Sequence, residues 1–245
     1  MNVLIVLAII GVLVLLVSAT GGLTLAATGY LIAKSTAKFG SSGGTSPPPQ
    51  PPQPAPSGDF DAASRTWRFA YGGGIGAGGS PNSLAPSPGF WFDMPTSGDV
   101  HYMVCPVNMN LTGKKEIAFS FQMNVSADAD FQASDPNEGP PCHVSIGLQR
   151  VGDDLATQLY SRWFSHLMMP LQDGAQSFVI PLDTANFGDV GGGLSDPRTP
   201  EQGLADCMAN CGNLLITFGG KYFAGHGVYL RKGAARFQLQ SYIVR

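Results

Sequence analysis

Alternation of apolar and polar side chains with a period of two residues constrains the fold of this chain more than any other feature. Between Ile117 and Val125 every second residue is apolar, and the residues between them are Ala, Ser, Gln and Asn. Such a period is typical of a β-strand with one buried face. The composition agrees, because 32 glycines and 19 prolines disfavour helices and only three glutamates are present to favour them.

Eight further segments carry the same pattern, three clearly and five more weakly. They are residues 144–148, 214–218, 236–243, 66–71, 100–105, 158–167, 177–182 and 227–231. Nine strands without regular intervening helices predict an all-β chain of antiparallel sheets, packed as a β-sandwich of jelly-roll type. In the last strand the residues expected to face the core are Phe237, Leu239, Ser241 and Ile243.

One short helix is expected as an insertion between two strands. Thr199 suits the N-cap, Pro200 the first helical position and Gln202 the third position of a capping box. The helix is expected to run to about Cys211 and to stop at Gly212.

The first 33 residues carry no charged side chain. An uncleaved transmembrane helix over about residues 3–25 is expected, and a signal peptide cut after Ala19 is the alternative. Lys34 and Lys38 follow this segment, and the positive-inside rule would place the rest of the chain in the cytoplasm. The composition downstream, with four cysteines and few lysines, favours the opposite side. We expect a single-pass membrane protein whose C-terminal domain is extracytoplasmic.

Three regions are therefore predicted along the chain. Residues 1–34 form the anchor or signal segment, residues 35–58 a Gly/Ser/Pro-rich linker, and residues 59–245 the sandwich domain. The proline run of the linker favours polyproline II, which makes a semi-rigid stalk. The formal net charge of −3 gives no electrostatic reason to expect nucleic-acid binding.

The four cysteines form an even set, which predicts two disulfides outside the cytoplasm. They are Cys105, Cys142, Cys207 and Cys211. Four free thiols and a zinc site with four thiolate ligands are the alternatives.

Two aspartates form a candidate calcium site. Asp128 and Asp130 share one side of an extended segment, and carboxylate oxygens are the ligands that Ca²⁺ prefers. The spacing is not that of an EF-hand, and a solvated loop is the alternative. No other cofactor and no catalytic residue is predicted, because neither a nucleophile motif nor a paired set of glycosidase carboxylates can be recognised.

The outward sides of the predicted strands carry amides and hydroxyls where Lys and Glu are commoner. Amides both donate and accept hydrogen bonds, which matches the hydroxyls of a sugar, and aromatic rings offer flat apolar surfaces to it. The candidate ligand-binding residues are Gln122, Asn124, His143, Gln149, Trp163, Tyr229, Gln238 and Gln240, with Trp91 and Tyr160 as further aromatic candidates. An antiparallel face covered by loops, or an ordinary exterior of low charge, is the alternative.

Three segments together resemble carbohydrate-binding modules of the jelly-roll type. They are Gly89–Asp93 with the sequence GFWFD, the amide-rich strand Ile117–Val125 and the closing strand Ala235–Ile243. The resemblance covers about residues 60–245 and implies a membrane-tethered sandwich that binds glycan or another surface polymer without transforming it. A structural or assembly protein of a cell envelope or virion is an alternative. A glycan hydrolase or lyase on the same fold is another.

Overall fold

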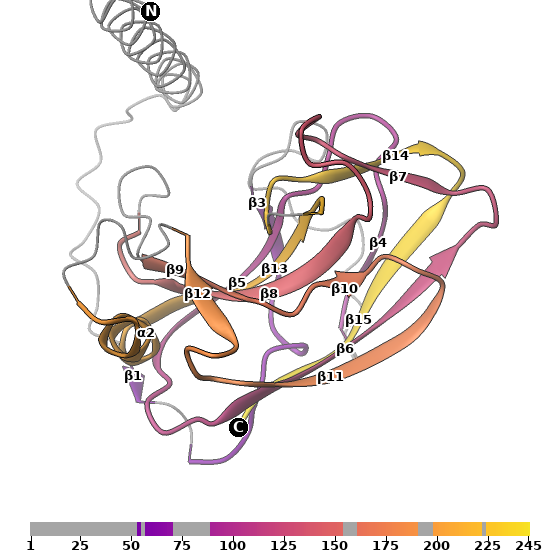
Figure 1. Ribbon diagram of the computed structural model, residues 1–245. Coiled ribbons are helices and arrows are strands. Elements are labelled where there is room, and N and C mark those ends of the chain that lie inside the picture. Colours follow the sequence, from indigo (N-terminus) through magenta and orange to yellow (C-terminus); the bar gives the residue numbers. More distant parts are fainter. Residues whose placement is uncertain (1–52, 55–56, 71–88, 154–160, 191–197, 222–223) are drawn as a thin grey trace, which may run out of the picture. The chain divides into compact units, whose positions relative to one another are not determined.

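The computed structural model describes residues 53–54, 57–70, 89–153, 161–190, 198–221 and 224–245 of the 245-residue chain. These residues form three β-sheets and one helix, and most strand pairs are antiparallel (Figure 1). The alternation in the sequence therefore predicted the all-β architecture correctly, and all nine predicted strand segments contain a strand.

The largest sheet, sheet A, has eight strands in the order β1-β5-β13-β8-β9-β12, with β3 beside β5 and β10 beside β8. Its strands are β1 (Gln53–Pro54), β3 (Arg68–Ala70), β5 (Tyr102–Asn110), β8 (His143–Arg150), β9 (Arg162–Ser165), β10 (Met169–Pro170), β12 (Phe187–Asp189) and β13 (Cys211–Gly219). Sheet B has five strands in the order β11-β6-β15-β2, with β4 also beside β15. They are β2 (Phe60–Asp61), β4 (Trp91–Asp93), β6 (Glu116–Val125), β11 (Gly174–Pro181) and β15 (Ala235–Val244). Sheet C is the pair β7 (Asp130–Ala133) and β14 (Val228–Lys232).

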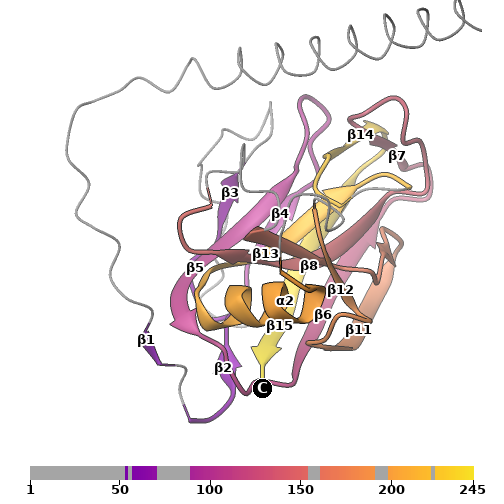
Figure 2. The same cartoon turned by 60° about the vertical axis from the view of Figure 1, so that its left-hand side comes forward.

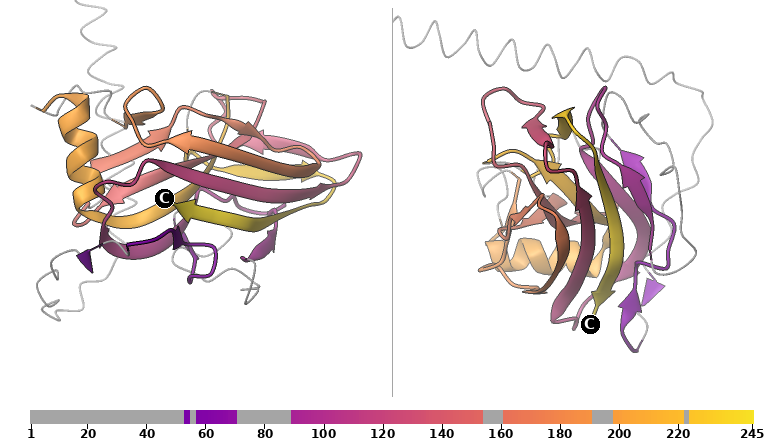
Figure 3. Two further views of the ribbon diagram at one scale, coloured as in Figure 1. Left: turned by 90° about the horizontal axis from the view of Figure 1, so that it is seen from below. Right: turned by 90° about the vertical axis from the view of Figure 1, so that its right-hand side faces the viewer.

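The core lies between sheets A and B, which Figure 3 shows as two layers. Aromatic rings from both layers meet there, because the apolar side of each strand faces the other sheet. The ring of Phe218 on β13 lies 5.5 Å from that of Phe237 on β15 and 5.8 Å from that of Phe92 on β4, both edge-on. Burial of these rings holds the two sheets together.

A β-bulge in β15 changes which of its residues face the core. The register with β6 pairs Leu239 with Phe121 and then Ser241 with Ser120, so Gln240 is the extra residue. Tyr242 is consequently buried and Ser241 half-buried. The prediction that Ser241 and Ile243 face inward was wrong, because the bulge shifts the alternation by one residue.

The predicted helix is present as α2 (Pro200–Ala209), and its predicted N-terminus is confirmed. The backbone N–H of Thr199 donates to Oε1 of Gln202 at 3.0 Å, and the N–H of Gln202 donates to Oγ1 of Thr199 at 3.4 Å. The helix ends earlier than predicted, since Asn210 is the C-cap and Cys211 already belongs to β13. Figure 2 shows α2 lying in front of sheet A, where it contacts β5, β8, β9 and β12.

The predicted membrane segment lies outside the described residues and stays a prediction. Within the part of the chain that the structure describes, no helix is long and apolar enough to cross a membrane. Near the end of the predicted linker, Gln53 and Pro54 pair in parallel with Met109 and Asn110 of β5. These linker residues therefore extend sheet A.

The predicted disulfides are absent, because all four cysteines are free and buried. Cys211 lies opposite Arg150 at one end of the β13–β8 ladder, whereas Cys142 precedes the other end, where His143 pairs with Gly219. The thiols of the helix and of β13 have different hydrogen-bond acceptors, since Cys207 donates to the carbonyl of Ser161 and Cys211 to that of Asn213.

Burial raises the pKa of Cys105 to about 12, that of Cys142 to about 11 and that of Cys211 to about 12. The thiols therefore remain protonated at neutral pH and serve as small apolar core residues. The even number of cysteines did not reveal this, because pairing depends on where the strands place the sulfur atoms.

Candidate functional site

The outer side of sheet B, here called the amide face, presents polar side chains from four adjacent strands. Its members are Trp91 and Asp93 of β4, Arg236, Gln238 and Ser241 of β15, Ser120, Gln122 and Asn124 of β6, and Ser177 of β11. Each is exposed or half-buried, while the residues between them point into the core. The alternation of side chains along each strand thus gives sheet B one solvent-accessible side and one buried side.

Register places these side chains in neighbouring rows. Trp91 pairs with Gln238, which pairs with Gln122, and the adjacent row runs from Asp93 through Arg236 to Asn124. The amide nitrogen of Gln122 donates to the carbonyl of Met123 at 2.8 Å, which fixes that side chain along its own strand. The predicted residues Gln122, Asn124 and Gln238 therefore lie together on one surface. Gln240 is exposed in the bulge next to them.

Trp91, Arg236 and Asp93 form one unit at the edge of the amide face. The guanidinium carbon of Arg236 lies 3.8 Å from the centroid of the Trp91 ring, a cation–π arrangement. The same guanidinium donates to both carboxylate oxygens of Asp93, at 2.7 and 3.1 Å. The hydrogen bond to Asp93 raises the pKa of Arg236. The two charges compensate each other, so this corner combines an aromatic ring with polar atoms and no net charge.

A groove of about 540 Å³ opens beside this unit. Its lining comes from four strands or their ends, namely Asp93, Met94, Thr96, Asn124, Leu230, Gly233, Ala234, Ala235 and Arg236. Among these described lining residues Asp93 is the only acid, and it is bound by Arg236. The groove therefore offers a polar and an apolar wall but not the two opposed carboxylates that glycoside hydrolysis needs.

The outer side of sheet A, here called the covered face, is different. His143, Ser145 and Gln149 of β8 point away from the core as predicted, yet they are buried. Burial lowers the pKa of His143 from 6.5 to about 4. Gln149 is engaged on both sides, because its amide nitrogen donates to Asp153 at 2.9 Å and its oxygen accepts from Asn213 at 2.7 Å. The structure therefore separates His143 and Gln149 from the other predicted ligand-binding residues.

An ion pair and an aromatic pair complete the covered face. Nε of Arg162 lies 3.1 Å from the carboxylate of Asp153, and both side chains are almost inaccessible to solvent, at 8% and 0%. The rings of Tyr102 and Phe164 lie 6.2 Å apart. Phe164 packs directly on the backbone of Gly147, where an added Cβ atom would come within 2.7 Å of the ring. The polar and aromatic groups of the covered face therefore contact other parts of the protein and not solvent.

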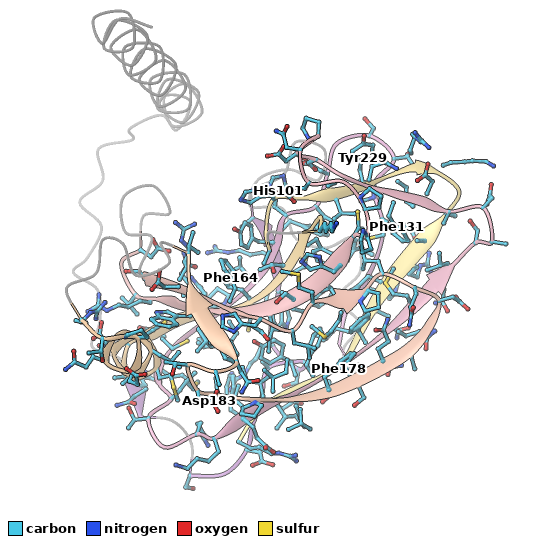
Figure 4. All side chains as sticks on the ribbon, in the orientation of Figure 1. His101, Phe131, Phe164, Phe178, Asp183 and Tyr229 are labelled. Carbon is cyan, nitrogen blue, oxygen red and sulfur yellow. The ribbon has the colours of Figure 1, made fainter. Side chains whose placement is uncertain are left out.

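Trp163 and Tyr229 do not join the amide face either. Trp163 pairs with Leu148 across β9 and β8, and both side chains lie in the core. Tyr229 lies on β14, and Figure 4 shows it at the β7–β14 end of the domain, away from Phe178 of β11 in sheet B. Tyr160 lies outside the described residues.

The aspartates of the predicted calcium site each contact a cation of β14. Asp130 accepts from Nε of Arg231 at 2.6 Å, and Asp128 lies 3.6 Å from Nζ of Lys232. The pKa of Asp130 is lowered chiefly by the hydrogen bond from Gln132, and that of Asp128 by the hydrogen bond from Ser126. Their charges are thus compensated by side chains, which disfavours Ca²⁺ binding at this position.

The contribution of Asp93 to the site was missed from the sequence. Asp93 follows Trp91 by two residues in the segment Gly89–Asp93, so period two places both side chains on one side of a strand. That spacing is the signal that was available. Its pairing with Arg236, 143 positions away along the chain, depends on the register between β4 and β15.

No family model matches the sequence, and no match is found among curated proteins. Among solved structures the chain is similar to the family 11 carbohydrate-binding module of the cellulosomal cellulase Lic26A-Cel5E of Clostridium thermocellum. The TM-score is 0.40 and the sequence identity 12%, over 78% of this chain and 95% of that module. This is a weak likeness at the level of the fold.

Proposed function

We propose that the sandwich domain binds a neutral glycan on its amide face and leaves it chemically unchanged. The observation that carries this proposal is the continuous outer surface of sheet B, where Gln122, Asn124 and Gln238 lie beside Trp91. Amides offer donors and acceptors to paired sugar hydroxyls, and an indole ring packs against the apolar side of a pyranose. The only charges in these rows, Arg236 and Asp93, neutralise each other.

The architecture we favour is a jelly-roll sandwich held at a membrane by its N-terminal segment, with the domain outside the cytoplasm. The uncharged residues 1–33 and the proline-rich run after them support this arrangement. A tether of this kind holds a binding domain clear of a surface and raises its local concentration near a surface polymer.

Two other functions receive less support from the described residues. Hydrolysis needs a second carboxylate facing Asp93, and the described lining of the groove supplies none. Assembly through an apolar patch needs contiguous exposed apolar side chains. The described chain has only four large exposed ones, Leu167, Met168, Val179 and Val190, so little apolar area is available there for such a patch.

Binding of the full chain to an array of neutral oligosaccharides and polysaccharides tests the proposal. Trp91→Ala and Gln238→Ala are expected to weaken retention by at least roughly tenfold, since aromatic anchors and buried amide contacts dominate such interfaces. Tyr229→Ala and Gln132→Ala are the matched controls, because they remove an aromatic residue and a glutamine from sheet C, and they are expected to bind as the unaltered chain does.

Failure of the folded, unaltered chain to bind any neutral glycan would contradict glycan binding itself. Loss of binding in the sheet C variants with retention in the sheet B variants would move the site off the amide face. Circular dichroism of each variant separates both outcomes from misfolding.

A further inference from the structure

A group of metal-ligating side chains lies at one end of sheet C, apart from the amide face. Asp135 follows β7 by two residues, and His226 precedes β14 by two residues. The antiparallel register pairs Ala133 with Val228, and the N–H of Ser134 donates to the carbonyl of Gly227 at 3.0 Å. The pairing of β7 with β14 therefore places the segment that contains Asp135 beside the segment that contains His226.

A tight turn returns Glu138 to the same place. Its N–H donates to the carbonyl of Asp135 at 3.1 Å, and Oε2 of its carboxylate accepts from the N–H of Gly220 at 3.0 Å. A Cβ atom at residue 220 would lie 2.7 Å from Cβ of Glu138, so this approach requires glycine. One ligand atom from each of Asp135, Glu138 and His226 lies within 4.8 Å of the others.

The buried carboxylate of Glu138 supplies an independent indication of a ligand. The residue is only 3% exposed, and its Oε1 atom receives no hydrogen bond from the described residues. Nδ1 of His226 lies 2.5 Å from that oxygen, and the two groups form an ion pair only when the imidazole is protonated. A buried carboxylate beside a second carboxylate costs free energy unless a cation is shared between them.

The donor set favours a transition-metal ion over calcium. Ca²⁺ takes six to eight oxygen ligands, whereas one imidazole with carboxylates suits Zn²⁺ and related ions. Ligand atoms about 2.1 Å from a tetrahedral Zn²⁺ lie roughly 3.4 Å from one another. The three groups here, with ligand atoms all within 4.8 Å of one another, are close enough to reach these separations by side-chain adjustment.

We propose that Asp135, Glu138 and His226 bind a divalent transition-metal ion of the Zn²⁺ type, which fastens the turn after β7 to the segment before β14. The fourth position is left to water or another ligand, as in other open three-ligand sites. This site differs in residues and in metal class from the Asp128–Asp130 pair, whose carboxylates contact Lys232 and Arg231.

Calorimetric titration of the metal-stripped full chain with Zn²⁺ tests this proposal. One equivalent is expected to bind and to raise the midpoint of thermal unfolding, because the ligand binds only the folded site. His226→Gln and Glu138→Gln are each expected to weaken Zn²⁺ binding roughly 100-fold or more. Loss of a residue that only hydrogen-bonds to a metal ligand already costs up to about 100-fold in affinity, and loss of a ligand itself should cost at least as much. His166→Gln removes an exposed histidine elsewhere and is the control expected to bind normally.

Absence of a one-to-one Zn²⁺ complex in the unaltered chain would overturn the proposal. Equal Zn²⁺ affinity in His226→Gln and in the unaltered chain would also overturn it. Unfolding of each variant without metal shows whether Glu138→Gln retains the fold, and His226→Gln provides the decisive comparison because His226 is exposed.

Discussion

On the outer side of sheet B the polar side chains of β6 and β15 reach solvent, whereas those of β8 in sheet A are buried and bonded to one another. Gln238 and Gln149 illustrate the contrast, since both are outward-pointing glutamines in central strands. Gln238 is half-buried beside Trp91, while Gln149 is held between Asp153 and Asn213. Glutamine therefore forms part of an accessible surface in sheet B, whereas in sheet A it makes hydrogen bonds within the protein.

The difference teaches that outward orientation and accessibility are separate properties. A strand decides orientation through its two-residue period, but another segment must pack on the face to bury it. Where this happens, unpaired polar groups become costly, so they bond to neighbours. The covered face should therefore be sensitive to the loss of single polar groups, and the amide face tolerant of it.

The largest expected effect comes from breaking the buried ion pair of the covered face. Arg162→Met should lower the free energy of unfolding by about 3–5 kcal/mol, because it leaves the carboxylate of Asp153 buried without this cation. Arg236→Met is the matched substitution on the amide face, where the pair with Asp93 is exposed, and it should leave stability nearly unchanged. Urea unfolding of the full chain measures both. Similar losses in the two variants would refute the distinction between the faces.

A smaller effect concerns pH. The pKa of His143 is about 4 in the folded state and 6.5 in its ordinary state, because burial disfavours the charged imidazole. Between these values the unfolded chain binds more protons than the folded chain, so stability falls as pH drops from 6.5 toward 4. We expect His143 to account for roughly 1–2 kcal/mol of the loss between pH 7.5 and pH 5.

Comparison of His143→Gln with His166→Gln checks this expectation by urea unfolding at the two pH values. His143→Gln should lose less stability than the unaltered chain on acidification, and His166→Gln should follow the unaltered chain. An unchanged pH dependence in His143→Gln would show that the imidazole is not buried in solution.

The smallest expected effect on stability tests the β-bulge at Gln240, which sets which residues of β15 face the core. The hydroxyl of Tyr242 is buried and has no hydrogen-bond partner among the described residues. Tyr242→Phe should therefore raise the free energy of unfolding by roughly 1 kcal/mol, because it removes an unsatisfied polar group. Tyr229→Phe, on β14, should have little effect. A clear loss of stability in Tyr242→Phe would mean that the hydroxyl is bonded and the register differs.

The sequence predicted the strands well because their signal is local. The alternation in Ile117–Val125 comes from the backbone itself, and it identified β6 nearly to its ends. The capping residues Thr199 and Gln202 likewise located the start of α2, since their hydrogen bonds span only one helical turn.

The candidate site was predicted only in part for the opposite reason. Gln122, Asn124 and Gln238 were recognised as outward-facing amides, and register brings them together. The bulge at Gln240, the burial of Trp163 and the approach of Glu138 to His226 each depend on segments distant in the chain. Disulfide pairing failed for the same reason, because cysteine number says nothing about where sulfur atoms lie.

By itself, then, the sequence determined which segments are strands, where the helix begins and which side of most strands is apolar. These properties follow from backbone geometry and from interactions over a few residues. The tertiary structure alone decided which polar faces are accessible, which charges meet and which aromatic rings are surface residues, because burial and pairing require packing between segments far apart in the chain. Trp91 and Trp163 are the same residue type, and only packing makes one a candidate ligand contact and the other part of the core.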